Sequence, residues 1–100
     1  MNNKPGMKEK VIGIGYYRRE QWLQLLETAA DAQILEKTYD EWLEILDSSM
    51  EKIKAHGIEP ELIHVDVNEL LDFCKNKGLQ NNAGARSIFI TELSRKKKEI

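Results

Sequence analysis

The residues best suited to hold a ligand are two glycines and two arginines near the start of the chain. Residues 13–19 read Gly-Ile-Gly-Tyr-Tyr-Arg-Arg, and the pattern predicts that a helix begins directly afterwards. Arginines at a helix N-terminus oppose the helix dipole, whose N-terminal end is already positive. A bound phosphate or carboxylate would remove this conflict, because glycines let backbone amides approach an anion and arginines pair with it. The candidate anion-binding residues are Gly13, Gly15, Tyr16, Tyr17, Arg18 and Arg19.

The same segment lacks the features of the common nucleotide-binding loops. The dinucleotide fingerprint requires a glycine three positions after Gly15, where this chain has Arg18. The loop is also too short for a P-loop, and the chain has no Gly-Lys-Ser/Thr sequence. The alternative interpretation is structural: the glycines shape a turn, and the arginines pair with acids such as Glu20 or Asp31.

Four further residues have side chains suited to metal binding or catalysis: His56, His64, Asp66 and Cys74. His64 and Asp66 would share one face of a strand, but no Cys-x-x-Cys or His-x-x-x-His spacing supports a metal site. Asp66 fits a helix cap better, and a cysteine beside leucines is typical of a buried small hydrophobe. We therefore assign no catalytic residue, no metal ligand and no cofactor, and we expect a non-enzymatic protein.

Trp22, Trp42 and Arg86 are the candidates for an interaction surface. Aromatic and arginine side chains dominate the energetics of many interfaces. The alternative for the tryptophans is a place in the core with the indole N–H bonded at its edge. For Arg86, the alternative is an ion pair within the chain. A further basic feature, the run Arg95-Lys96-Lys97-Lys98, could contact nucleic acid or simply complement the C-terminal pole of a helix.

The elements that must position these residues follow from hydrophobic spacing and capping signals. Strands are predicted at residues 11–17 and 61–67, and helices at residues 19–32 and 38–57. Thr38 and Glu41 form a capping box, and Gly57 ends that helix. Asp66 or Asn68 caps a third helix that Gly78 ends, and Asn81 or Asn82 starts a fourth.

The predicted fold is therefore α+β and helix-dominated, in the order β-α-α-β-α-α, with a small two-stranded sheet. Long helical connections favour parallel pairing of the strands. Because a two-stranded sheet is marginal alone, either four helices cover it or a second copy extends it. The alternative is an all-α four-helix bundle.

Composition sets the class of protein. The chain has 100 residues, of which 41% are hydrophobic and 32% charged, with a net charge of −2 and one cysteine. These values predict one soluble domain in a reducing, cytoplasmic setting, with no membrane span and little general affinity for nucleic acid. We expect a flexible N-terminus at residues 1–9, a globular domain at 10–97 and a frayed end at 98–100. Met7 is an alternative start to Met1.

Much of the chain between Lys10 and Lys96 resembles small uncharacterised prokaryotic proteins of similar length. The resemblance rests on the following residues: Ile12, Gly13, Ile14, Gly15, Tyr16, Tyr17, Arg18, Trp22, Leu25, Leu26, Trp42, Leu43, Val65, Asp66, Val67, Cys74, Gly78 and Leu79. It implies no particular activity. The expected function is an interaction or assembly module that self-associates or docks on a protein partner. Binding of a small anion or nucleotide at residues 13–19 is the alternative, and a nucleic-acid accessory role is the third.

Overall fold

The structure is a computed structural model that describes residues 10–98, and its elements follow the predicted order. They are β1 (Lys10–Tyr16), α1 (Arg19–Thr28), the short 3-10 helix η2 (Ala32–Ile34), α2 (Tyr39–Ala55), β2 (Ile58–His64), α3 (Val67–Lys77) and α4 (Ala83–Lys98). The α+β prediction is confirmed, and the all-helical alternative is wrong. The expectations for residues 1–9, for a start at Met7 and for residues 99–100 lie outside the described residues, whereas Lys98 still belongs to α4.

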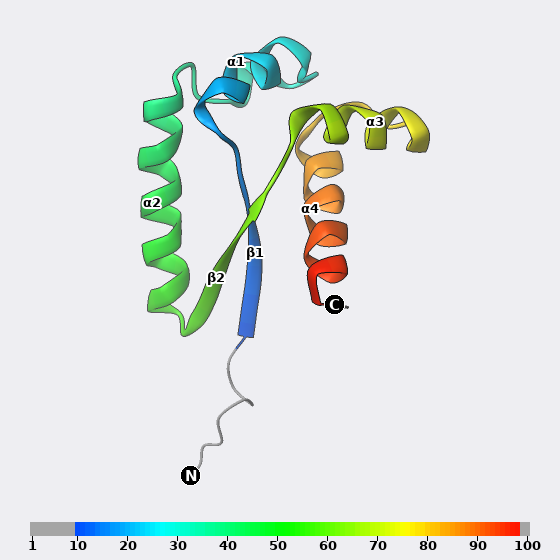
Figure 1. Cartoon of the computed structure of the whole chain (residues 1–100). Helices are drawn as coiled ribbons and strands as arrows, with labels where there is room; N and C mark the ends of the chain where they lie inside the picture. The colour runs from blue at the N-terminus through cyan, green and yellow to red at the C-terminus, as the bar shows by residue number, and fades with distance from the viewer. Residues whose placement is uncertain (1–9, 99–100) are drawn as a thin grey trace.

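The sheet has two parallel strands, in register from Lys10 opposite Ile58 to Tyr16 opposite His64. Figure 1 shows α2 along one side of the sheet and α4 along the other, with α1 and α3 lying across the end where both strands finish. We call this end of the sheet the closed end. It brings together the segments that follow β1 and β2, and the segment after β1 includes the predicted site residues Tyr17, Arg18, Arg19 and Trp22.

The predicted helix boundaries are mostly confirmed by their caps. Thr38 and Glu41 form both hydrogen bonds of the capping box at the start of α2. Asp66 Oδ1 accepts from the backbone N–H of Glu69, 3.2 Å away, and so caps α3. Gly57 and Gly78 adopt the left-handed φ values of 77° and 69° that end α2 and α3.

Three boundaries differ clearly from prediction. Strand β2 ends at His64 instead of residue 67, because Asp66 caps α3 and Val67 already belongs to that helix. The other two differ because contacts between distant segments decide them. Helix α1 ends at Thr28 instead of residue 32, since the N–H of Ala30 bonds to the carbonyl of Asn81 at 2.8 Å instead of continuing the helix. Strand β2 begins at Ile58 instead of residue 61, because the left-handed Gly57 turns the chain so that Ile58 pairs with Lys10. Pro60 is therefore inside the strand.

The glycines of β1 allow α4 to pack closely against the sheet. A Cβ atom on Gly15 would lie 2.5 Å from Cδ1 of Ile90, and one on Gly13 would lie 3.2 Å from Cγ1 of Ile63 and 3.4 Å from Cβ of Ser94. A larger side chain at Gly15 would push α4 away. The glycines of β1 thus allow close packing of α4 on the strand.

Candidate functional site

The predicted anion-binding segment is divided between β1 and the start of α1. Gly13 and Gly15 lie within β1 against α4, and Tyr17 is buried. Their backbone amides therefore do not gather around one point with the amides of α1. Arg18 occupies the N-cap position of α1 without a side-chain hydrogen bond to the helix.

Both arginines of this segment have partners within the chain. Arg18 Nε lies 3.3 Å from Oε2 of Glu20, as the structural interpretation expected. Arg19 donates to Asp40 at 2.9 Å, and its guanidinium carbon lies 4.7 Å from the centre of the Tyr39 ring. These pairs are exposed, so an anion could compete for the arginines at small cost. Anion binding here stays a prediction.

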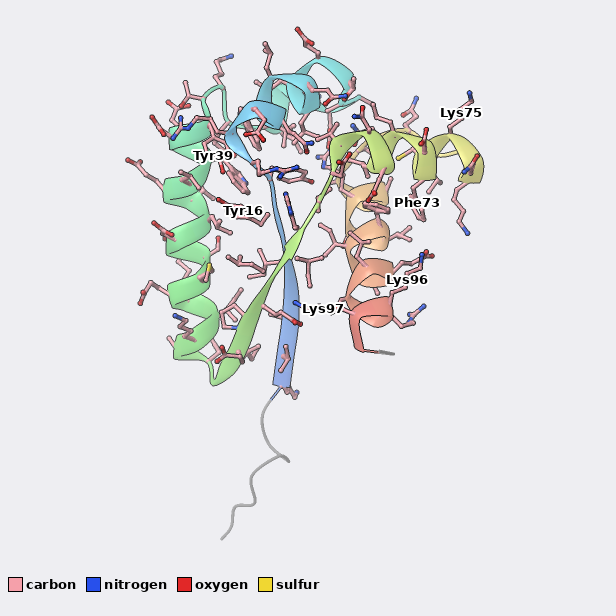
Figure 2. All side chains as sticks on the ribbon, viewed as in Figure 1. Tyr16, Tyr39, Phe73, Lys75, Lys96 and Lys97 are labelled. Carbon is pink, nitrogen blue, oxygen red and sulfur yellow. The ribbon has the colours of Figure 1, made fainter. Side chains whose placement is uncertain are left out.

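All three tyrosines and both tryptophans gather at the closed end, and we call Tyr16, Tyr17, Trp22, Tyr39 and Trp42 the aromatic cluster. Trp22 and Trp42 stack with ring centres 5.1 Å apart. Tyr16 and Tyr39 point toward each other between β1 and α2 (Figure 2), and their hydroxyl oxygens are 3.3 Å apart. Burial raises the pKa of Tyr39 to about 12 and raises that of Tyr17 above its ordinary value.

Two of the three residues of the predicted interaction surface, Trp22 and Arg86, are buried within the chain. Trp22 is only 4% exposed and donates its indole N–H to the carbonyl of Glu36 at 3.2 Å, so it belongs to the core. Trp42 is half-buried against it. Arg86 is 7% exposed. Trp22 and Arg86 can both be buried because segments distant in the sequence provide acceptors for their N–H groups.

Arg86 forms a buried bidentate ion pair with Asp31, 55 residues away. Its two terminal nitrogens donate to the two carboxylate oxygens, each at 2.9 Å, and one also donates to Asn81. Asp31 accepts in addition from the N–H of Ala83 at 2.9 Å. The hydrogen bond from Arg86 holds the pKa of Asp31 below its usual range. We call these contacts the Asp31/Arg86 network; it joins the segment after α1 to the start of α4.

The other candidate groups do not come together. His64 lies at the end of β2 beside Tyr16, whereas His56 bonds through Nδ1 to the carbonyl of Lys52. Cys74 is buried in α3, where burial raises the pKa of its thiol. Within residues 10–98, no three His, Cys, Asp or Glu side chains lie close enough to share a metal ion. Of the basic run, Lys97 pairs with Glu61 at 3.0 Å, while Arg95 and Lys96 are exposed.

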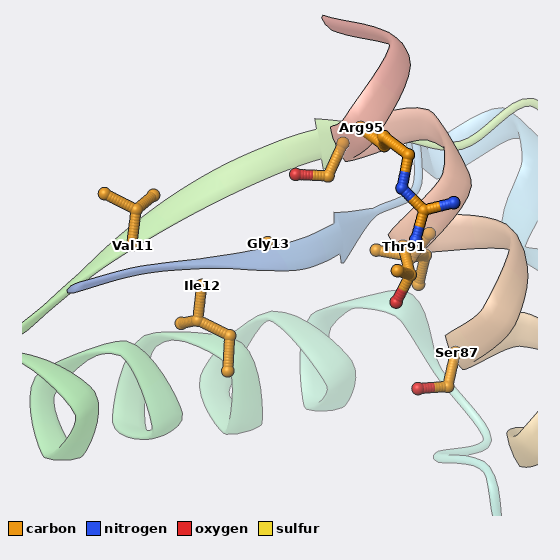
Figure 3. A pocket seen from close by; sticks show the side chains of 8 residues that line it. Val11, Ile12, Gly13, Ser87, Thr91 and Arg95 are labelled. Atoms are coloured by element: carbon orange, nitrogen blue, oxygen red, sulfur yellow. The ribbon is translucent and has the colours of Figure 1, made fainter. Parts of the chain in front are cut away.

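A groove opens between β1 and α4 (Figure 3). Its volume is about 510 Å³. We call it the edge groove; it is lined by Val11, Ile12, Gly13, Ser87, Ile90, Thr91, Ser94 and Arg95. The strand contributes an apolar wall, and α4 contributes hydroxyl groups and one guanidinium. Sequence reasoning missed the α4 side, because these hydroxyls have no motif and become neighbours only when α4 packs on β1.

The backbone beside the edge groove has hydrogen-bonding groups that point away from the sheet. The N–H of Val65 bonds to the carbonyl of Tyr16 at 2.9 Å, so Tyr16 directs its backbone groups toward β2. Because this direction alternates along a strand, Ile12 and Ile14 also face β2. Val11, Gly13 and Gly15 therefore face outward, where no strand among residues 10–98 pairs with them.

The outer edge of β2 is different. By the same alternation and the register, Pro60 is among the β2 residues that face away from β1. Proline has no N–H, so at this position it costs the sheet no hydrogen bond and leaves a gap in the donors of that edge. The sheet thus has one edge that proline protects and one, formed by β1, without such protection.

No protein-family model, curated protein or solved structure matches this chain. Among residues 10–98, no helix has both the length and the apolar character that crossing a membrane requires. The resemblance to small prokaryotic proteins stays a prediction.

Proposed function

We propose that this chain is a non-enzymatic interaction module that receives an extended segment of protein along the free edge of β1. The observation that carries the proposal is the row of outward-facing backbone groups at Val11, Gly13 and Gly15, beside the edge groove. Adding a strand to an exposed sheet edge is a recurrent mode of recognition, in which main-chain hydrogen bonds give affinity and neighbouring pockets give specificity.

The energetics of a small sheet support this proposal. Two strands alone form a marginal sheet, and a third strand would add both hydrogen bonds and cross-strand contacts. Val11 and Ile12, which are adjacent at the start of β1, are 44% and 45% exposed. An added strand would cover them. Long, apolar, unprotected edges are rare in proteins that remain alone, because they pair with other chains.

Selection of short linear peptides from a random library on the immobilised protein tests this function. The proposal predicts that selected peptides protect the amides of Val11, Gly13 and Gly15 from hydrogen exchange, as followed by NMR. It also predicts that Val11→Pro abolishes their binding, because it removes one outward N–H without touching the bonds to β2. The matched control, Val11→Thr, keeps that N–H and nearly the same side-chain volume and should still bind.

Two results would contradict the proposal. One is the selection of peptides that bind equally well to Val11→Pro and shift resonances elsewhere. The other is a protein that selects no peptide and whose outward-facing amides stay unprotected at every concentration.

A further inference from the structure

We infer that the segment paired with β1 is β1 of a second copy, running antiparallel about a two-fold axis through Gly13. This inference rests on the proposed function and names its partner. The resulting assembly is a four-stranded sheet in the order β2-β1-β1-β2, with both α2 helices on one face and both α4 helices on the other.

The outward-facing backbone N–H and C=O groups of one β1 strand are complementary to those of a second, antiparallel β1. They lie at every second residue, at Val11, Gly13 and Gly15, so a two-fold axis at Gly13 places Val11 of each copy opposite Gly15 of the other. Each of these residues can exchange both of its backbone groups with its counterpart, which gives about six hydrogen bonds between copies. A second copy thus satisfies the whole free edge.

The side chains on the two faces of β1 also suit this pairing. The same axis puts Ile12 of one copy opposite Ile14 of the other on the face toward α2, so that the exposed Ile12 gains an apolar neighbour. On the face toward α4, Val11 meets Gly15, where no side chain competes for space. The α4 helices face each other through small residues of the edge groove, Ser87, Thr91 and Ser94.

The area is close to that of a specific interface. Strand β1 has 7 residues and is therefore about 23 Å long. The sheet edge and the α4 layer are each about 10 Å thick, so each copy contributes about 450 Å² and the pair about 900 Å². A specific interface needs about 1,000 Å², so this dimer lies at the weak end of specific interfaces and should depend on protein concentration.

The charge of Arg95 distinguishes a second copy of this chain from an acidic peptide of another protein as the partner of β1. Arg95 lines the edge groove and belongs to α4, so the two copies bring like charges to the same side of the new sheet. Salt screens such repulsion and should tighten the dimer. An acidic peptide from a different protein would instead bind more weakly as salt rises, because its attraction to Arg95 is screened.

Sedimentation equilibrium of the whole chain over a concentration range from about 1 μM to 1 mM, at low and high salt, tests the inference. The expected result is a monomer–dimer equilibrium that Val11→Pro weakens about 30-fold, since two symmetric hydrogen bonds are lost. Val11→Thr should leave it unchanged. Circular dichroism and thermal melting verify that each variant folds.

A second variant does not touch the strand. Thr91→Lys, at an exposed position of α4, places a cation beside Arg95 of the opposite copy and should weaken the dimer about tenfold. A monomer at 1 mM would overturn the inference, and the proposed function would then depend on the peptide selection alone. A dimer unaffected by both Val11→Pro and Thr91→Lys would also overturn it, because the copies would meet elsewhere.

Discussion

The closed end of the sheet and the free edge of β1 differ in how their polar groups are satisfied. At the closed end, distant segments satisfy the polar groups, as when Asp31 pairs with Arg86 and Trp22 with the carbonyl of Glu36. At the free edge, the backbone of Val11, Gly13 and Gly15 faces away from β2, and no strand of residues 10–98 pairs with it. The described residues thus satisfy their own polar groups at the closed end, whereas they provide no strand to pair with the free edge.

A substitution in the closed end should have the largest effect on the free energy of unfolding. Asp31→Ala leaves the buried charge of Arg86 without its counter-ion and should lower the free energy of unfolding by about 3–5 kcal/mol in urea denaturation. The matched control is Glu20→Ala, which breaks the exposed ion pair with Arg18 and should cost about 0–1 kcal/mol. Equal effects for the two substitutions would mean that the buried network does not hold the closed end together.

The contact between β1 and α4 gives the next largest effect. Gly15→Val forces its side chain into Ile90 and should destabilise the chain by about 1–3 kcal/mol, measured by thermal or urea unfolding. Gly84→Ala is the control, because a Cβ there meets nothing closer than 3.6 Å and alanine favours the helix by about 0.5–1 kcal/mol. A neutral Gly15→Val would show that α4 does not pack against β1 as described.

Alkaline pH should weaken the aromatic cluster. The pKa of Tyr39 is raised to about 12 from an ordinary 10, so its contribution to stability is complete below pH 10 and is lost as the pH rises toward 12. Tyr17 shifts in the same direction. Tyr39→Phe should therefore reduce the loss of stability between about pH 10 and 11.5 in urea titrations. An unchanged slope would contradict the burial of this phenol.

The smallest effect is expected at the two arginines of the predicted anion site. Replacing Arg18 and Arg19 together by alanine breaks only exposed pairs and should change stability by about 1 kcal/mol or less. Self-association should not change. Titration with inorganic phosphate, followed by NMR, tests the alternative function: shifts at Arg18 and Arg19 that vanish in the double variant would support anion binding there.

Local signals in the sequence predicted most of the fold. The caps at Thr38 and Asp66 and the stops at Gly57 and Gly78 depend on neighbouring residues, so they can be read directly. The end of α1 and the start of β2 depend on pairing with Asn81 and Lys10, which lie far along the chain.

The functional features were harder to predict for the same reason. The spacing of apolar residues in its helix predicts that Arg86 lies on the surface. Asp31 becomes its neighbour only when the chain has folded. The free edge had one signal in the sequence: Pro60 protects the outer edge of β2, and β1 has no proline. That signal gains meaning only once the register of the sheet is known.

Amide hydrogen exchange in β1, measured residue by residue at low and high protein concentration, tests the central claim most directly. The account predicts that Ile12 and Ile14 are protected at every concentration, because they bond to β2. Val11, Gly13 and Gly15 should exchange quickly in dilute solution and become protected as the concentration rises. If these amides are already protected in the monomer, β1 has no free edge and the account is contradicted. If they exchange quickly at every concentration, a second copy does not pair with β1.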